Sequence, residues 1–289
     1  MDNKFEIIVK TKKKVKNLGL SLGGGGTRGC AHIGVLKAFE ENDIKFDFVA
    51  GTSVGALVGA FYCAGFKTDD MIKIVKSINE KDIRTNKIPF VPSRTDGIIN
   101  LIKSHIGDID ISQLKIPFCA VAVDVRSGNE IHITSGNLAK AVAGSCAVPG
   151  IFNPVEFDKY LLFDGGLQNT IPSNVPKIFN CEKTISVDVN SARGSGTKST
   201  KYIDLMMASI GIMMKSNVIK GYLNSDLMVK PKVSKFKSTS LSHIDEMILE
   251  GYNSALEVIP TIKEMIRKKK KKKYKKDLAN EKLKNEKNN

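Results

Sequence analysis

The chain has few cysteines, and no two of them are close in sequence. The five cysteines stand singly in apolar stretches such as IPFCAVAV, and no CxxC motif occurs among the 289 residues. Disulfide frameworks and zinc sites need regularly paired cysteines, so we expect neither, and we expect no metal or other cofactor. We interpret these residues as small core side chains of a protein in a reducing compartment.

Long hydrophobic runs are also missing. The longest, ALVGAFYCAGF at 56–66, is about half as long as a membrane-spanning helix, so we interpret it as a buried helix. LGLSL at 18–22 follows several lysines but is too short for the core of a secretory signal peptide. We therefore expect a cytoplasmic protein, and any association with a membrane should be peripheral.

Acidic residues are scarce at both ends of the chain, whereas the middle is balanced. Of the formal net charge of +15, residues 261–289 supply +9, from 13 Lys and Arg against 4 Asp and Glu. Residues 1–16 supply +4, and the 26 basic and 24 acidic residues of 17–260 leave only +2. A nearly neutral body argues against a nucleic-acid partner. We therefore divide the chain into a basic N-terminal extension (1–16), one domain (17–260) and a lysine-rich C-terminal tail (261–289).

Short buried-strand patterns alternate with helical patterns along most of the chain. LGLSL precedes a helical stretch, CAHIGVLKAFEEN at 30–42, and FDFVA at 46–50 precedes the apolar helix at 56–66. This order is typical of a parallel α/β unit. Further strand patterns are PFCAVAVDV, EIHIT, YLLFDGG and KTISVDVN, at 117–125, 130–134, 160–166 and 183–190. The sequence therefore predicts a three-layer α/β/α fold with a mostly parallel central sheet.

The segment 202–224 is rich in methionine and has a helical pattern. Its methionines are Met206, Met207, Met213 and Met214. Because methionine fills irregular gaps in cores, we interpret this helix as core or as cover of the sheet, in preference to a lipid-binding stripe.

One serine stands between glycines after a predicted strand. In GTSVG at 51–55, Gly51 and Gly55 remove the side chains that could crowd the hydroxyl of Ser53. This spacing also occurs in ordinary turns, so by itself it is a weak signal. The preceding strand and the following helix strengthen it, since they form the context of a nucleophile turn.

A glycine cluster, GGGGTRG at 23–29, lies between the first strand and the first helix. Its GxGxxG spacing is that of a dinucleotide site, but no acid follows the second strand to hold a ribose. Glycines at a helix N-terminus also let backbone amides converge on an anion, which is the geometry of an oxyanion hole. Parallel strands place both loops at one sheet edge, so the amides of Gly24, Gly25 and Gly26 should face the same space as Ser53.

A serine nucleophile needs a base. None of the four histidines lies in a glycine-framed loop at a strand end, whereas Asp164 of FDGG does. Asp124 and Asp188 also end strands, and we interpret them as turn or capping acids. His243 follows Asp164 in the sequence, so a triad of Ser53, Asp164 and His243 remains an alternative.

Three motifs in this order, GGGTRG at 24–29, GTSVG at 51–55 and DGG at 164–166, resemble those of the patatin-like phospholipases. The resemblance covers roughly residues 17–190. It implies a lipid acyl hydrolase with a Ser–Asp dyad and no catalytic histidine, acting on phospholipids or lysophospholipids.

Carried over residue by residue, the resemblance makes Ser53 the nucleophile and Asp164 its base. The oxyanion loop is then Gly24, Gly25 and Gly26. Arg28 would hold this loop or the substrate phosphate. The other supporting positions that the motifs imply are Gly51, Gly55, Gly165 and Gly166. Ser145 and Pro149 belong to a structural block near the site.

A last helix is expected from SHID at 242–245, and it continues into RKKKKKKYKK at 267–276, where nine of ten positions are basic. A run of like charges is usually a solvated tail. Each basic residue near an anionic bilayer gains on the order of 1 kcal/mol, so the tail is also a candidate tether to an anionic membrane surface. The basic ends leave open a further alternative, a non-catalytic protein that binds anionic surfaces.

Overall fold

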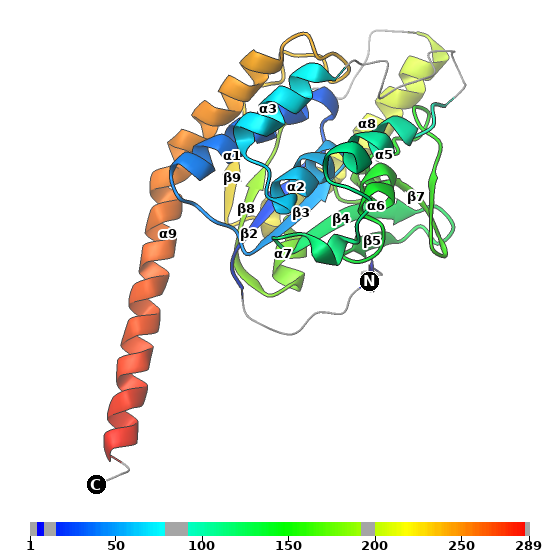
Figure 1. Ribbon diagram of the computed structural model, residues 1–289. Coiled ribbons are helices and arrows are strands. Elements are labelled where there is room, and N and C mark those ends of the chain that lie inside the picture. The colour runs from blue at the N-terminus through cyan, green and yellow to red at the C-terminus, as the bar shows by residue number, and fades with distance from the viewer. Residues whose placement is uncertain (1–4, 9–15, 79–91, 192–199, 287–289) are drawn as a thin grey trace.

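The computed structural model describes residues 5–8, 16–78, 92–191 and 200–286, which build one mixed β-sheet between layers of helices (Figure 1). The strand order is β1-β5-β4-β3-β2-β8-β9, with β7 beside β4 and β6 beside β7. The strands are β1 (Phe5–Ile8), β2 (Lys16–Leu22), β3 (Phe48–Thr52), β4 (Phe118–Asp124), β5 (Glu130–Ile133), β6 (Val155–Phe157), β7 (Tyr160–Asp164), β8 (Cys181–Val187) and β9 (Leu227–Val229).

The longer helices are α1 (Cys30–Glu41), α2 (Val54–Ala64), α3 (Thr68–Ser77), α5 (Asp96–His105), α6 (Leu138–Ser145), α7 (Asn174–Ile178), α8 (Tyr202–Asn224) and α9 (Ile244–Glu286). Short 3-10 turns are η1 (Gly26–Gly29), η2 (Ile111–Gln113) and η3 (Gly165–Leu167). The pairings among β1, β2, β3, β4, β5, β8 and β9 are parallel except β4–β5, whereas β7 is antiparallel to both neighbours. The predicted α/β fold with a mostly parallel sheet is confirmed.

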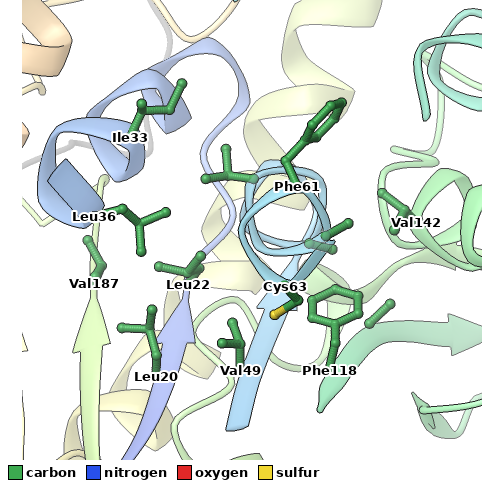
Figure 2. Close-up of a cluster of buried hydrophobic side chains, with 14 of the residues drawn as sticks. Leu20, Leu22, Ile33, Leu36, Val49, Phe61, Cys63, Phe118, Val142 and Val187 are labelled. Carbon is green, nitrogen blue, oxygen red and sulfur yellow. The ribbon is translucent and has the colours of Figure 1, made fainter. Parts of the chain in front are cut away.

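The main core lies between the sheet and the layer of α1 and α2 (Figure 2). Alternate residues of a strand point to opposite faces, so each strand supplies side chains to two layers. Facing α1 and α2 are Leu20, Leu22, Val49 and Phe118, which meet Ile33, Leu36, Phe61 and Cys63. On the other face Phe48 stacks on Phe179, next to α7, with ring centroids 4.7 Å apart. All five cysteines are buried and unpaired, as the sequence predicts.

Both basic ends of the chain contribute regular structure. Residues 5–8 form the edge strand β1, parallel to β5, which the sequence pattern did not predict. Helix α9 packs along α1 and then runs away from the body through the lysine tract (Figure 1). Because Ile262 is fully buried, the packed part of α9 extends beyond residue 260, where we placed the domain boundary.

The methionine-rich helix α8 is not a core helix. Its inner side covers η3, but Leu205, Ile212, Met213 and Leu223 are exposed to solvent. The contacts with η3 fit the interpretation of α8 as a covering helix, whereas the alternative, a core helix, is wrong. Over the described ranges, no helix combines the length and the apolarity that crossing a bilayer requires.

Candidate active site

Ser53 occupies a sharp turn between β3 and α2. Its backbone has φ 56° and ψ −127°, a conformation that non-glycine residues rarely adopt. A Cβ on Gly51 would come 2.4 Å from the carbonyl oxygen of Gly55, and a Cβ on Gly55 would come 2.1 Å from that of Leu22. The two glycines of the motif therefore allow the turn to form, as well as leaving the hydroxyl uncrowded.

The antiparallel strand β7 brings Asp164 to this turn. Both β5 and β7 pair with Ala122 of β4, so they lie on opposite sides of β4, and β7 shares the side of β3. On that side Thr52 pairs with Val121, and Asp164 pairs with the next residue, Ala122. Because β3 runs parallel to β4 and β7 runs antiparallel, their carboxyl ends meet head-on. Ser53 and Asp164, at those two ends, are brought together.

The carboxyl group of Asp164 is buried, and within the described residues only one of its two oxygens accepts a hydrogen bond. Its side chain is 3% exposed, and Oδ1 accepts a hydrogen bond of 2.7 Å from the amide of Gly166. Oδ2 has no hydrogen-bond partner in the described part of the chain. Burial raises the pKa of Asp164 from 3.8 to about 6, against opposing effects of the Ser53 hydroxyl and the Gly166 amide. Ser53 is thus close enough to influence the carboxyl, without the geometry of a hydrogen bond.

Ser145, at the end of α6, fixes the serine turn to the sheet. Its Oγ accepts a hydrogen bond of 2.9 Å from the amide of Ser53 and donates one of 2.6 Å to the carbonyl of Val121. The amide of Asp164 donates to the carbonyl of Ala147, 3.0 Å away, just beyond α6. The end of α6 therefore holds both members of the predicted dyad, a role more specific than the structural block that the sequence suggested.

The glycine loop lies against the serine. One of its amides is hydrogen-bonded within the described part of the protein, and two are not. Gly24 packs so closely that a Cβ on it would stand 3.3 Å from Cβ of Ser53. Its amide donates to the carbonyl of Thr170, 2.9 Å away, and is therefore occupied. The amides of Gly25 and Gly26 have no acceptor among the described residues. The candidate oxyanion donors are thus Gly25 and Gly26, and the assignment of Gly24 as a third donor needs correction.

Two side chains set the direction of these amides. Asn190 Nδ2 donates to the carbonyl of Gly24 at 2.8 Å, and a trans peptide points the next amide the opposite way. The amide of Gly25 therefore faces away from Asn190. Arg28 is buried and donates to the carbonyl of Phe236 at 2.8 and 2.7 Å and to Asn190 Oδ1 at 3.0 Å. Of the two roles predicted for Arg28, these contacts favour holding the loop. Asn190 was not predicted.

The histidines occupy other environments. His32 is fully buried and its Nε2 donates to the carbonyl of Gly23 at 2.8 Å, while burial lowers its pKa to about 4. His105 is exposed at the end of α5, and His132 contacts Glu130 at 2.6 Å. His243 is half exposed and contacts Glu246 at 3.1 Å. In the described ranges, neither a histidine hydrogen bond to Ser53 or Asp164 nor a cluster of three metal-binding side chains is present.

Each of the two competing acids at strand ends accepts one hydrogen bond within its own turn and one from a distant segment. Asp124 accepts hydrogen bonds from the amides of Ser127 and Leu161. Asp188 accepts from the amide of Asn190 and the hydroxyl of Tyr222. Neither is bonded to Ser53.

A pocket of about 550 Å³ opens at Ser53. Its wall is almost entirely apolar, with Leu57 and Phe61 from α2, Ile74 from α3 and Leu101 from α5. The few polar side chains in the wall include Thr27 and Ser238. The volume is within the range of small-molecule sites, about 300–1,000 Å³, and the lining suits a hydrocarbon chain.

Comparison with known proteins places these features in a family. The fold resembles that of VipD from Legionella pneumophila, with a TM-score of 0.50 and 14% sequence identity over 86% of this chain and 67% of that one. An uncharacterized NTE family protein of Mycobacterium tuberculosis is 33% identical over 186 residues, covering 63% of this chain and 51% of the relative.

Two animal proteins are also similar. The neuropathy target esterase sws of Drosophila melanogaster is 28% identical over 82% of this chain and 19% of its own length. Patatin-like phospholipase domain-containing protein 7 of Rattus norvegicus is 33% identical over 65% of this chain and 14% of its own. The aligned parts thus span about half of the mycobacterial relative and less of the animal ones. The family model for patatin-like phospholipase matches residues 20–175, and the chain belongs to that family.

Proposed function

We propose that this chain hydrolyses acyl esters of phospholipids or lysophospholipids, with Ser53 and Asp164 as a catalytic dyad. The observation that carries the proposal is the meeting of these two residues at the ends of β3 and β7, with Ser53 in the wall of an apolar pocket. One is a hydroxyl on a strained turn, and the other is a buried carboxyl with a free oxygen. The names of the relatives, an esterase and a phospholipase-domain protein, support an ester bond in a lipid as the target.

The mechanism follows from the positions of these groups. Ser53 Oγ attacks the ester carbonyl carbon while its proton passes to Asp164, and the amides of Gly25 and Gly26 stabilise the oxyanion. The alcohol leaves with that proton, and the acyl group stays on Ser53. Water then attacks the acyl-enzyme and gives a proton to Asp164, and the fatty acid is released as Asp164 passes that proton to Ser53 Oγ.

The raised pKa of Asp164 makes the dyad workable without histidine. A carboxylate with the ordinary pKa of about 3.9 is a weak base at neutral pH, whereas efficient proton transfer favours a pKa nearer the working pH. Burial brings the pKa of Asp164 to about 6, so that it is mostly ionised at pH 7 yet accepts a proton more readily.

The proposal is tested by labelling with a fluorophosphonate and by hydrolysis of a panel of phospholipids and lysophospholipids. We expect the label on Ser53 and no hydrolysis by Ser53→Ala. Ser238→Ala is the matched control, because it removes another hydroxyl from the same pocket and should keep most of the activity. Full activity in Ser53→Ala, or lipid binding without any hydrolysis by the wild type, would contradict the proposal.

The alternative triad is tested by His243→Ala. His243 is half exposed and pairs with Glu246, so we expect its removal to leave hydrolysis nearly unchanged. A folded but inactive His243→Ala protein would instead assign the base function to a triad that includes this histidine.

A further inference from the structure

Asn169 connects the strand that carries Ser53 to the turn that carries Asp164. Its carbonyl oxygen accepts a hydrogen bond of 2.8 Å from the hydroxyl of Thr52, the residue before Ser53. Its amide donates one of 2.8 Å to the carbonyl of Gly165, the residue after Asp164. Thr52 and Asn169 are both completely buried, so water does not compete for these bonds. A single residue therefore bridges the backbone beside each member of the proposed dyad.

The next residue, Thr170, extends this bridge to the glycine loop. Its carbonyl accepts the hydrogen bond of 2.9 Å from the amide of Gly24, which directly precedes Gly25. Its hydroxyl donates to the carbonyl of Gly166 at 3.1 Å, within the same turn. The segment 169–170 is thus bonded to the serine strand, the acid turn and the glycine loop together.

A buried anion anchors the side chain of Asn169. Asn169 Nδ2 donates to Glu130 Oε1 at 2.6 Å and to Asn174 Oδ1 at 2.8 Å. Glu130 is itself only 4% exposed, and it also contacts His132 Nε2 at 2.6 Å and Lys220 Nζ at 2.7 Å. Burial by itself raises the pKa of Glu130, but the contacts with His132 and Lys220 lower it to about 2. Glu130 is therefore ionised and can only accept hydrogen bonds, which fixes the N–H side of the Asn169 amide toward it.

This anchoring gives Asn169 one position from which to hold Thr52. Its amide, its carbonyl and its side-chain nitrogen are each bonded to a different segment, namely η3, β3 and β5. A buried group that loses its partner costs more than an exposed one, because water cannot replace the bond. The position of Asn169, and through it that of Thr52, is therefore set by contacts outside the reacting groups.

We propose that Thr52 and Asn169 are positioning residues of the proposed hydrolysis. The bond between them holds the serine turn at the end of β3 against the acid turn at the end of β7, which keeps the Ser53 hydroxyl within reach of Asp164. The inference rests on the proposed function, because it assigns these residues a role in a reaction of that dyad. The rate depends steeply on such placement, since a displacement of about 1 Å can cost about 10²-fold.

The test uses the full chain with Thr52→Val, which replaces the hydroxyl by a methyl group of similar size. Thr52→Ser is the conservative variant, because it keeps the hydroxyl. Thr184→Val is the matched control, since Thr184 is a fully buried strand residue whose Oγ1 has no hydrogen-bond partner in the described part of the chain. Steady-state kinetics on a soluble short-chain ester, thermal unfolding and amide hydrogen exchange are measured for each protein.

We expect Thr52→Val to lower kcat by about 10- to 100-fold with little change in KM, whereas Thr52→Ser and Thr184→Val keep most of the wild-type kcat. Amide exchange in a peptide that covers residues 164–172 should also be faster in Thr52→Val. A wild-type kcat in folded Thr52→Val, with or without a lower melting temperature, overturns the proposal, since the bond would then only stabilise the fold. An equal loss in Thr184→Val also overturns it, because the removal of any buried hydroxyl would then have the same effect.

Asn169→Ala tests the other end of the bond. If both residues act through one link, the protein that combines Thr52→Val with Asn169→Ala should be little slower than Asn169→Ala alone. Losses in kcat that multiply would show that the two residues act separately, and would overturn the proposal. If Asn169→Ala does not fold, the Thr52 variants decide the question by themselves.

The two proposals fail in different ways. If the wild type hydrolyses the ester through Ser53 but Thr52→Val is equally fast, the proposed function stands and the positioning role is wrong. If no protein hydrolyses the ester while Thr52→Val speeds amide exchange in residues 164–172, the bond fixes the acid turn as inferred and the catalytic proposal is wrong.

Discussion

Asn190 and Gly24, 166 positions apart in the sequence, are joined by a hydrogen bond of 2.8 Å from Nδ2 to the carbonyl oxygen. This bond turns the next peptide so that the amide of Gly25 faces away from Asn190. We expect Asn190→Ala to lower kcat by about 10- to 100-fold, because a misdirected oxyanion donor loses most of its contribution. Steady-state kinetics on a soluble ester measure this, with the KM little changed.

Asn190→Asp separates the two bonds of this side chain. The aspartate keeps an oxygen for Arg28 but has no N–H for the carbonyl of Gly24. The Asn190→Asp protein should therefore lose as much activity as the Asn190→Ala protein. Its thermal stability should stay at the wild-type value. Wild-type kcat in Asn190→Asp would show that the direction of the Gly24–Gly25 peptide does not depend on this bond.

The pH dependence of hydrolysis should report the ionisation of Asp164. The base must be deprotonated, and its pKa is about 6, so kcat/KM for a soluble ester should rise with pH around 6 and level off above about 7. An ordinary aspartate would already be ionised at pH 5. Because a histidine base would give a similar curve, the profile is repeated with His243→Ala, which should reproduce it. Asp164→Asn should lower the rate by about 10²- to 10⁴-fold.

The same carboxyl should make the folded state less stable as pH rises. A pKa raised from 3.8 in the unfolded chain to about 6 in the folded one means that the folded state binds the proton more tightly. This stabilisation is present at low pH and is lost as pH rises through 6. Asp164→Asn removes the effect, so its free energy of unfolding relative to the wild type should increase by on the order of 1 kcal/mol from pH 5 to pH 8. Urea unfolding at both pH values tests this, and an unchanged difference would argue against the raised pKa.

The lysine tract should act on anionic membranes if it is a tether. Ile262 is buried and residues 267–276 follow it, so truncation after Ile266 removes the tract and leaves the packed part of α9 in place. We expect weaker binding to anionic vesicles at low salt and slower hydrolysis there, with unchanged hydrolysis of a soluble ester. Equal vesicle binding by the truncated and full-length chains would make the tract a bystander.

The parts of the fold that depend on residues close together in the sequence could be predicted from the sequence. The strand, glycine loop and helix around Gly24, and the turn at Ser53, follow from apolar runs and glycine spacing within a few residues. Asp164 stands out for the same reason, as an acid between an apolar strand and two glycines. The predicted layers and the mostly parallel sheet follow from the alternation of such units.

The features that could not be predicted from the sequence depend on contacts between distant segments. No pattern within YLLFDGG indicates that β7 runs antiparallel on the side of β3, since its direction is set by pairing with β4. The bond from Asn190 to Gly24 and the support of Ser53 by Ser145 are long-range in the same way. The sequence left open whether α8 is a core helix or a covering helix, because apolar composition alone does not distinguish a core helix from one with an uncovered outer side.

The head-on meeting of β3 and β7 makes the reactive pair depend on pairing between segments that are distant in the sequence. A chain in which only the first α/β unit has formed would carry Ser53 on its turn but no acid beside it, because Asp164 arrives only when β7 pairs with β4. A register slip of one residue in β7 would turn the carboxyl to the opposite face of the sheet. The time at which Ser53 becomes reactive to a fluorophosphonate during refolding should therefore report when β7 pairs with β4.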